Sequence, residues 1–105
     1  MDKKKIENAL KFGKIEWRKH ALERMLERGI SRKEVKTVLE QGEIIENYKN
    51  DTPFESALFF YIDKKPIHVV ASLDESTMTI YVITAYIPDT THFNKDLKTR
   101  KRDEE

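Results

Sequence analysis

Residues 31–48 read SRKEVKTVLEQGEIIENY, and the spacing of the apolar residues changes within this stretch. Ser31 stands three residues before Glu34, which predicts a capping box in which each side chain accepts a hydrogen bond from the other residue's backbone N–H group. Apolar residues then repeat at helical spacing up to Gly42: Val35, Val38 and Leu39. From Glu43 onward, β-branched and aromatic residues predominate. The stretch therefore predicts a helix that gives way to the first strand of a sheet.

Two further helices are predicted before this one. Residues 2–12 form the first, which ends at Gly13 and has a face of three apolar residues: Ile6, Ala9 and Leu10. Residues 18–28 form the second, which ends at Gly29 and has a face of four apolar residues: Ala21, Leu22, Met25 and Leu26. A short extended piece over residues 15–17 is predicted between the two helices.

Four segments rich in β-branched and aromatic residues follow the helices, over residues 44–48, 57–62, 67–73 and 79–86. The last two connections are as short as hairpin turns, and short connections favour antiparallel neighbours. The predicted fold class is therefore α+β, with N-terminal helices packed on one face of a four-stranded antiparallel sheet.

The length of 105 residues supports one domain with one modest core. We expect a single α+β domain over residues 1–93 and a charged C-terminal tail over residues 94–105, because the tail is almost wholly polar. The net charge of +1 names no partner. No apolar run approaches the length of a membrane span, so we expect no membrane association and a cytoplasmic location.

The sequence lacks the motifs that several kinds of enzyme chemistry require. It has no cysteine, which excludes disulfides and thiol nucleophiles, and it has no glycine-rich phosphate loop or serine-hydrolase motif. The three histidines, His20, His68 and His92, are scattered without metal-ligand spacing. We therefore expect no metal and no cofactor.

The helix over residues 18–28 carries a slanted stripe of three cationic or ionisable residues, His20, Arg24 and Arg28. Arg28 comes closest to the apolar face, so its guanidinium group should reach past the rim of the core. Guanidinium groups match phosphate oxygens bidentately, and the stripe is a candidate phosphate clamp. The alternative is an ordinary ion-paired helix face, because Glu23 and Glu27 lie within reach.

A second candidate group lies on the predicted strands. His68 stands inside an apolar strand, while Thr84 and Tyr86 share one face of the last strand. A shift of one residue in the turn over residues 74–77 decides whether His68 shares that face. A lone strand histidine is more often a hydrogen-bonded structural residue than a base, and the spacing leaves both readings open.

Four runs of residues indicate a family. They are HALERMLERGIS at residues 20–31, GEII at 42–45, PIHVV at 66–70 and ITAYIP at 83–88. In their order and content these runs resemble the DUF4258 family, a domain of unknown function, over residues 14–93. The layout of that family is in turn similar to the RelE, ParE and BrnT superfamily of bacterial toxins, several of which cleave RNA without a metal.

This resemblance implies a toxin-type, metal-independent ribonuclease or RNA-binding domain of a toxin–antitoxin-like system. Cleavage by attack of a ribose 2′-hydroxyl needs a base, an acid and fixed positive charge. His68 or His20 is the candidate base, and Tyr86 is the candidate acid or base-stacking platform. The candidate substrate-binding residues are Arg24, Arg28 and Thr84. The implied partners are RNA or the ribosome, and an antitoxin-like protein.

The rival hypothesis is a non-catalytic protein-binding or regulatory module. In that case the same polar residues lock the helix to the sheet, and the surface docks a protein. Geometry separates the two: convergence of these residues in an open cleft favours catalysis, whereas burial with mutual hydrogen bonding favours the module.

Overall fold

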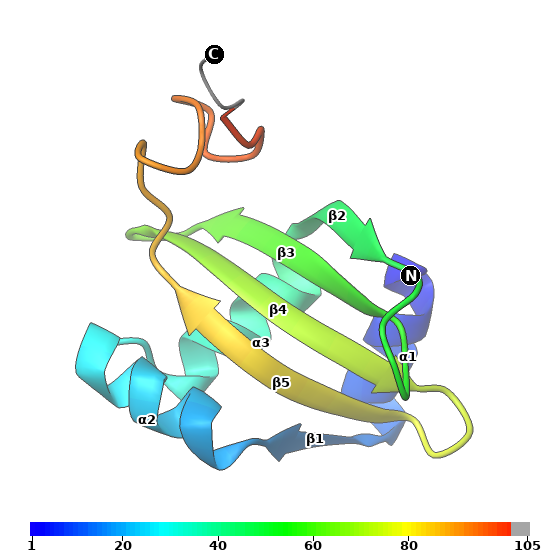
Figure 1. Ribbon diagram of the computed structural model, residues 1–105. Coiled ribbons are helices and arrows are strands. Elements are labelled where there is room, and N and C mark those ends of the chain that lie inside the picture. Colours follow the sequence, from blue (N-terminus) through cyan, green and yellow to red (C-terminus); the bar gives the residue numbers. More distant parts are fainter. Residues whose placement is uncertain (102–105) are drawn as a thin grey trace.

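The computed structural model describes residues 1–101, with three helices and five strands (Figure 1). The helices are α1 (Lys3–Phe12), α2 (Lys19–Arg28) and α3 (Arg32–Gln41). The strands are β1 (Lys14–Trp17), β2 (Glu43–Tyr48), β3 (Ser56–Ile62), β4 (Pro66–Asp74) and β5 (Thr79–Tyr86). The α+β class is confirmed, as is the order in which helices precede most of the sheet.

Helix α3 begins with the predicted capping box. The backbone N–H of Glu34 donates to the Ser31 hydroxyl oxygen at 3.0 Å, and the backbone N–H of Ser31 donates to the Glu34 carboxylate at 2.9 Å. These bonds satisfy two backbone donors that a helix start would otherwise leave unpaired. The helix buries the three predicted apolar residues, Val35, Val38 and Leu39.

Helix α2 ends as predicted at Gly29, which has the left-handed conformation with φ 68°. The sequence pattern predicts that Leu26 belongs to the core, and this prediction is wrong: Leu26 is 85% exposed. The helix packs mainly along β5 and buries a narrow stripe of Ala21 and Met25. Leu26 lies about 100° round the helix from Met25, outside this stripe.

The sheet has five strands in the order β1-β5-β4-β3-β2, so the prediction of a purely antiparallel four-stranded sheet is wrong. The piece predicted over residues 15–17 is the additional strand, β1, and it pairs in parallel with β5 through Lys14 to Trp17 and Thr79 to Val82. The other pairs are antiparallel. The pairing of β1 is not visible locally, because its partner lies about 65 residues further along the chain.

The register between β4 and β5 places His68 directly opposite Tyr86 and Val70 opposite Thr84. A bulge follows, since Val70 pairs with Thr84 but Ala71 pairs with Val82. Paired residues point to the same side of a sheet, so His68, Thr84 and Tyr86 share one face. The question that the sequence leaves open is thus resolved.

The two faces of the sheet are covered differently. Figure 1 shows α1 and α3 behind the sheet and α2 alongside β5. The helix-covered face contributes to the main core from three strands: Ala57 and Phe59 on β3, Ile67, Val69, Ala71 and Leu73 on β4, and Ile80, Val82 and Ala85 on β5. We call the opposite side the outer face. The segment after β5 passes over one end of this outer face and positions the candidate site.

Candidate functional site

His68 lies at the centre of the polar group on the outer face, and its side chain is fully buried. Its Nε2 atom lies 2.7 Å from the carbonyl oxygen of Leu97, in the segment after β5. A carbonyl oxygen only accepts hydrogen bonds, so Nε2 carries a hydrogen atom and is the donor of this hydrogen bond. Burial lowers the pKa of His68, and the bond to Leu97 offsets only part of that effect. The imidazole is therefore neutral and has a single tautomer.

Tyr86 completes the hydrogen bonding of this imidazole. Its hydroxyl oxygen lies 3.2 Å from Nδ1 of His68, and the neutral Nδ1 atom is an acceptor, so the phenol donates. Burial raises the pKa of Tyr86, which keeps the phenol protonated. A continuous chain of hydrogen bonds thus runs from Tyr86 through His68 to Leu97. The His68 nitrogens are both used within the fold.

Aromatic rings enclose His68 on three sides. Phe60, Tyr86 and Phe93 contact its ring edge-to-face, with ring centroids 5.2, 5.2 and 4.7 Å away. Phe93 is itself buried, although it follows the last strand by several residues. These contacts exclude water from the imidazole and account for the lowered pKa.

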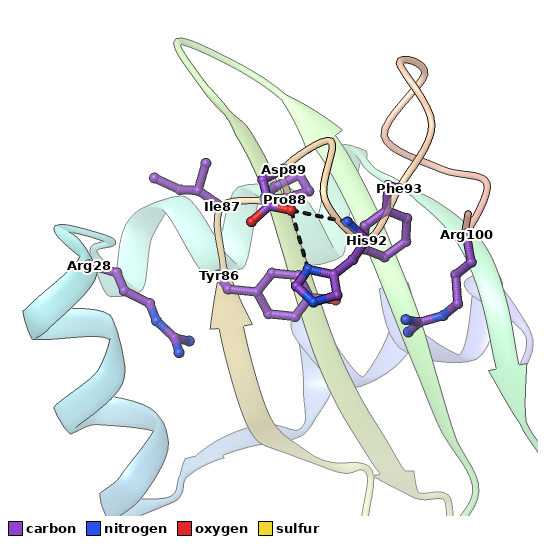
Figure 2. Close-up of a pocket in the computed structure, with 8 residues that line it drawn as sticks. All are labelled: Arg28, Tyr86, Ile87, Pro88, Asp89, His92, Phe93 and Arg100. Carbon is purple, nitrogen blue, oxygen red and sulfur yellow. Dashed lines mark hydrogen bonds and ion pairs between the residues drawn. The ribbon is translucent and has the colours of Figure 1, made fainter. Parts of the chain in front are cut away.

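An open pocket of about 510 Å³ lies beside this cluster, at the end of β5. We call it the Tyr86 pocket. Its polar and charged lining comes from three parts of the chain: Arg28 of α2, Tyr86 of β5, and Asp89, His92 and Arg100 of the segment that follows. Figure 2 shows Arg28 and Arg100 reaching toward the pocket from opposite sides of the Tyr86 ring. His68 packs against the Tyr86 ring and does not line this pocket.

Arg28 is held at the pocket by the sheet itself. Its guanidinium group donates to the carbonyl oxygen of Ala85 at 2.8 Å. Strand β1 pairs with β5 only as far as Val82, so Ala85 lies on a part of β5 that β1 does not cover. The guanidinium satisfies this edge carbonyl and keeps several other N–H donors for a ligand.

Arg100 approaches from the other side. Its guanidinium lies 5.0 Å from the centroid of the Phe93 ring, and its Nε atom donates to the Glu46 carboxylate at 2.9 Å. Glu46 also accepts a short hydrogen bond from the Tyr48 hydroxyl. Glu46 engages Nε and the Tyr48 hydroxyl also hydrogen-bonds to the guanidinium group, so an anion in the pocket would use the remaining N–H donors of Arg100.

His92 is the exposed imidazole of the pocket. Its Nδ1 atom lies 3.3 Å from the Asp89 carboxylate, which also accepts from the backbone N–H group of His92 (Figure 2). The same carboxylate accepts from the backbone N–H group of Thr91. These backbone bonds are the largest cause of the lowered pKa of Asp89, which keeps that carboxylate charged. An aspartate oriented in this way fixes the ring and leaves Nε2 for a ligand.

The residues predicted from the sequence do not all meet. Arg28 and Tyr86 line the Tyr86 pocket, and His68 and Thr84 share their face of the sheet. His20 lies near the start of α2, where its side chain is 92% exposed and pairs with Glu23 at 3.3 Å. Arg24 is exposed and pairs with Glu27 at 3.4 Å, as the ion-paired reading of the helix face expects.

Sequence reasoning misses three residues of the pocket, Asp89, His92 and Arg100. An aspartate three residues before a histidine, just after Pro88, is a pattern that could have indicated the Asp89–His92 pair. Arg100 has no such signal, because its place depends on the path of the chain after β5. Within residues 1–101, no group of three or more histidine, aspartate or glutamate side chains could hold a metal ion.

These features define a class: a small α+β domain with a mixed sheet whose cationic, aromatic and imidazole groups gather where the last strand ends. The model of the family described as "Domain of unknown function (DUF4258)" matches residues 17–87, and the chain belongs to that family. No curated protein and no solved structure matches the chain. None of the helices in residues 1–101 is long and apolar enough to cross a membrane.

Proposed function

We propose that the chain binds single-stranded RNA at the Tyr86 pocket. The observation that carries this proposal is the arrangement of two guanidinium groups and an exposed imidazole around one open pocket, from Arg28, Arg100 and His92. Guanidinium groups pair with phosphate oxygens, and aromatic faces such as that of Tyr86 stack on unpaired bases. Both features suit a flexible strand better than a rigid duplex.

We infer a toxin-type class by analogy: the layout of the DUF4258 family resembles that of the RelE, ParE and BrnT toxins, in which helices accompany a largely antiparallel sheet. An analogy of fold transfers no role to a residue. RNA or the ribosome, and an antitoxin-like protein, are the partners that this class implies.

Metal-independent cleavage is a second candidate function, and the Asp89–His92 pair favours it. In this scheme Nε2 of His92 takes the proton from a ribose 2′-hydroxyl, and the 2′-oxygen forms a bond to the adjacent phosphorus. The bond from phosphorus to the 5′-oxygen breaks, and that oxygen takes a proton from water. Arg28 and Arg100 stabilise the charge on the phosphorus oxygens. His92 replaces His68 as the base, because the nitrogens of His68 are hydrogen-bonded within the fold.

The burial of His68 also gives weight to the rival module. Its bonds to Tyr86 and Leu97 are what a structural lock requires, and no buried side-chain nitrogen or oxygen within residues 1–101 lacks a partner. A protein-binding or regulatory module would use these residues only to hold its shape. Assays of RNA binding and RNA cleavage separate the three functions: RNA binding, RNA cleavage and protein binding.

Binding is measured by fluorescence anisotropy with labelled hexauridylate at several salt concentrations. The variants are Arg28→Gln and His92→Gln, with Lys11→Gln as the control that removes a charge from an exposed position on α1. We expect Arg28→Gln to weaken binding and to reduce the salt slope by about 0.7, the value for one phosphate contact to a single strand. Lys11→Gln should leave both unchanged.

Cleavage of the same RNA is followed on gels, with and without excess chelator. If the chain is a ribonuclease, wild type cleaves in chelator, and His92→Gln slows cleavage by about 100-fold or more while it still binds. Salt-sensitive binding without cleavage supports the RNA-binding function alone. If the wild type neither binds nor cleaves RNA, alone or with ribosomes, the proposal is wrong and the protein-binding module is the remaining function.

A further inference from the structure

A second pocket, of about 620 Å³, lies where β1 leads into α2 and beside the middle of β5. We call it the Tyr81 pocket. Its lining includes Arg18, Lys19 and His20 at the start of α2, and Tyr81 and Ile83 on β5. None of these residues lines the Tyr86 pocket. The pocket thus combines cationic and apolar surface at a site that the proposed function does not yet use.

Tyr81 presents an aromatic ring on the outer face of the sheet. It alternates with the core residues Ile80 and Val82 and therefore points away from the helix-covered face. The Phe54 ring stacks on it, nearly parallel, with ring centroids 5.8 Å apart. This stacking restrains the Tyr81 ring, so a base that packs against it loses little further freedom.

The Arg18 guanidinium group lies 5.7 Å from the centroid of the Tyr81 ring. A ligand ring on Tyr81 could take that place, after which the guanidinium would pair with the ligand's phosphate. Within residues 1–101, neither Arg18 nor Lys19 forms an ion pair with an acidic side chain. Positive charge at the pocket is therefore available to an anionic ligand.

The carboxylate among the lining residues, that of Glu16, is paired with Lys14 at 3.4 Å, while Arg18 and Lys19 each carry a positive charge. The lining thus has a positive balance, which suits a polyanion better than an acidic or apolar peptide.

The same strand and the same helix connect the two pockets. Tyr81 and Tyr86 both lie on the outer face of β5, and α2 runs beside them with Arg18 next to its start and Arg28 at its end. A helix of ten residues is about 15 Å long. If a single strand of RNA occupied both pockets, the protein would contact several of its nucleotides, as single-strand-binding domains commonly do.

We propose that the Tyr81 pocket is a base-stacking subsite that extends the RNA site of the proposed function. One nucleobase stacks on Tyr81, and Arg18 and Lys19 hold the neighbouring phosphates. This inference rests on the proposed function, because it assigns the second end of the same bound strand. A strand that fills only the Tyr86 pocket does not need it.

The test uses length dependence. Anisotropy compares labelled triuridylate and hexauridylate with the wild type, Tyr81→Leu and Tyr81→Phe, and thermal melts verify that each variant folds. We expect the wild type to bind the hexamer more tightly than the trimer. Tyr81→Leu, which removes the planar ring, should weaken hexamer binding by about tenfold, whereas Tyr81→Phe, which keeps the ring, should not. Trimer binding should be the same in all three proteins.

A second pair of variants tests the charge. Arg18→Gln should lower hexamer affinity and its salt dependence, while Lys11→Gln should not. If the wild type binds the hexamer but Tyr81→Leu and Tyr81→Phe bind it with equal affinity, the subsite assignment is wrong and the RNA site at the Tyr86 pocket stands. If neither RNA binds the wild type, the proposed function fails and the subsite fails with it. A protein that binds a peptide and not RNA would give this last result, in which neither RNA binds the wild type.

Discussion

Nε2 of His68 lies 2.7 Å from the carbonyl oxygen of Leu97, which follows it by 29 residues. The bond joins a buried residue of β4 to a turn that is almost entirely exposed and polar. Because Nδ1 of the same ring accepts from Tyr86, one imidazole connects two strands and the segment after them. A neutral, buried histidine thus ties that segment to the sheet.

Replacing this histidine should destabilise the protein. His68→Leu introduces an apolar side chain of similar size and leaves the Leu97 carbonyl and the Tyr86 hydroxyl without their partner. We expect the free energy of unfolding to fall by about 2 kcal/mol or more in urea denaturation. Tyr86→Phe removes one of the two bonds and should cost about 1 kcal/mol. Equal stability of His68→Leu and wild type would show that the bonds contribute nothing net.

Stability should also depend on pH through His68. Burial lowers its pKa in the folded state below the ordinary 6.5, so below pH 6.5 the unfolded chain takes up a proton that the folded chain does not. Stability is therefore fully present above pH 6.5 and falls as the pH decreases from there toward the folded pKa. Urea midpoints between pH 7.5 and 5 should show this fall, and His68→Leu should lose it. A fall of the same size in His68→Leu would assign it to other groups.

The capping box of α3 should make a separate contribution. Ser31→Ala removes the hydroxyl that accepts from the Glu34 N–H, and we expect a loss of about 1 kcal/mol in a thermal or urea melt. Ser31→Asp should retain most of the stability, because aspartate is an equally good cap. If Ser31→Ala melts like the wild type, the helix does not depend on this cap.

Removal of residues 94–105 tests the predicted domain boundary. The main core lies between Ile6 and Ala85, so the truncated chain should still unfold in one cooperative transition. Its midpoint should decrease, because the partner of His68 at Leu97 and the Arg100–Glu46 pair are lost. Loss of a cooperative transition in the truncated chain would make the segment part of the folding unit.

Local signals in the sequence were sufficient for much of the fold. The capping box at Ser31, the stop at Gly29 and the alternation along the last strand each depend on residues within a few positions of one another. The parallel pairing of β1 was not predictable in this way. Four residues with a weak alternation become a strand only because β5 offers a free edge, which is a property of the assembled sheet.

The candidate site was likewise predictable only where it depends on residues close together in the sequence. The spacing on α2 correctly gave Arg28 a position at the edge of the core, where it bonds to Ala85. The same spacing could not separate Arg28 from Arg24, although only Arg28 lines the pocket, because the distinction depends on where β5 ends beside α2. Arg100 and His92 reach the pocket through the turns after β5, and their sequence neighbours do not reveal that path.

The parallel pairing of β1 with β5 has a consequence for how the chain acquires its structure during synthesis. Lys14 leaves the ribosome early, but its partner Thr79 is added about 65 residues later. At a synthesis rate of about 5–20 residues per second, β1 waits roughly 3–13 seconds for the strand it will join. During that interval α1, α2 and α3 can form by local contacts, whereas the sheet cannot be completed. Strand β5, which carries both proposed RNA-contacting tyrosines, is therefore the last strand of the sheet to be made. The proposed RNA site is complete only when the segment with His92 and Arg100 has followed β5 from the ribosome.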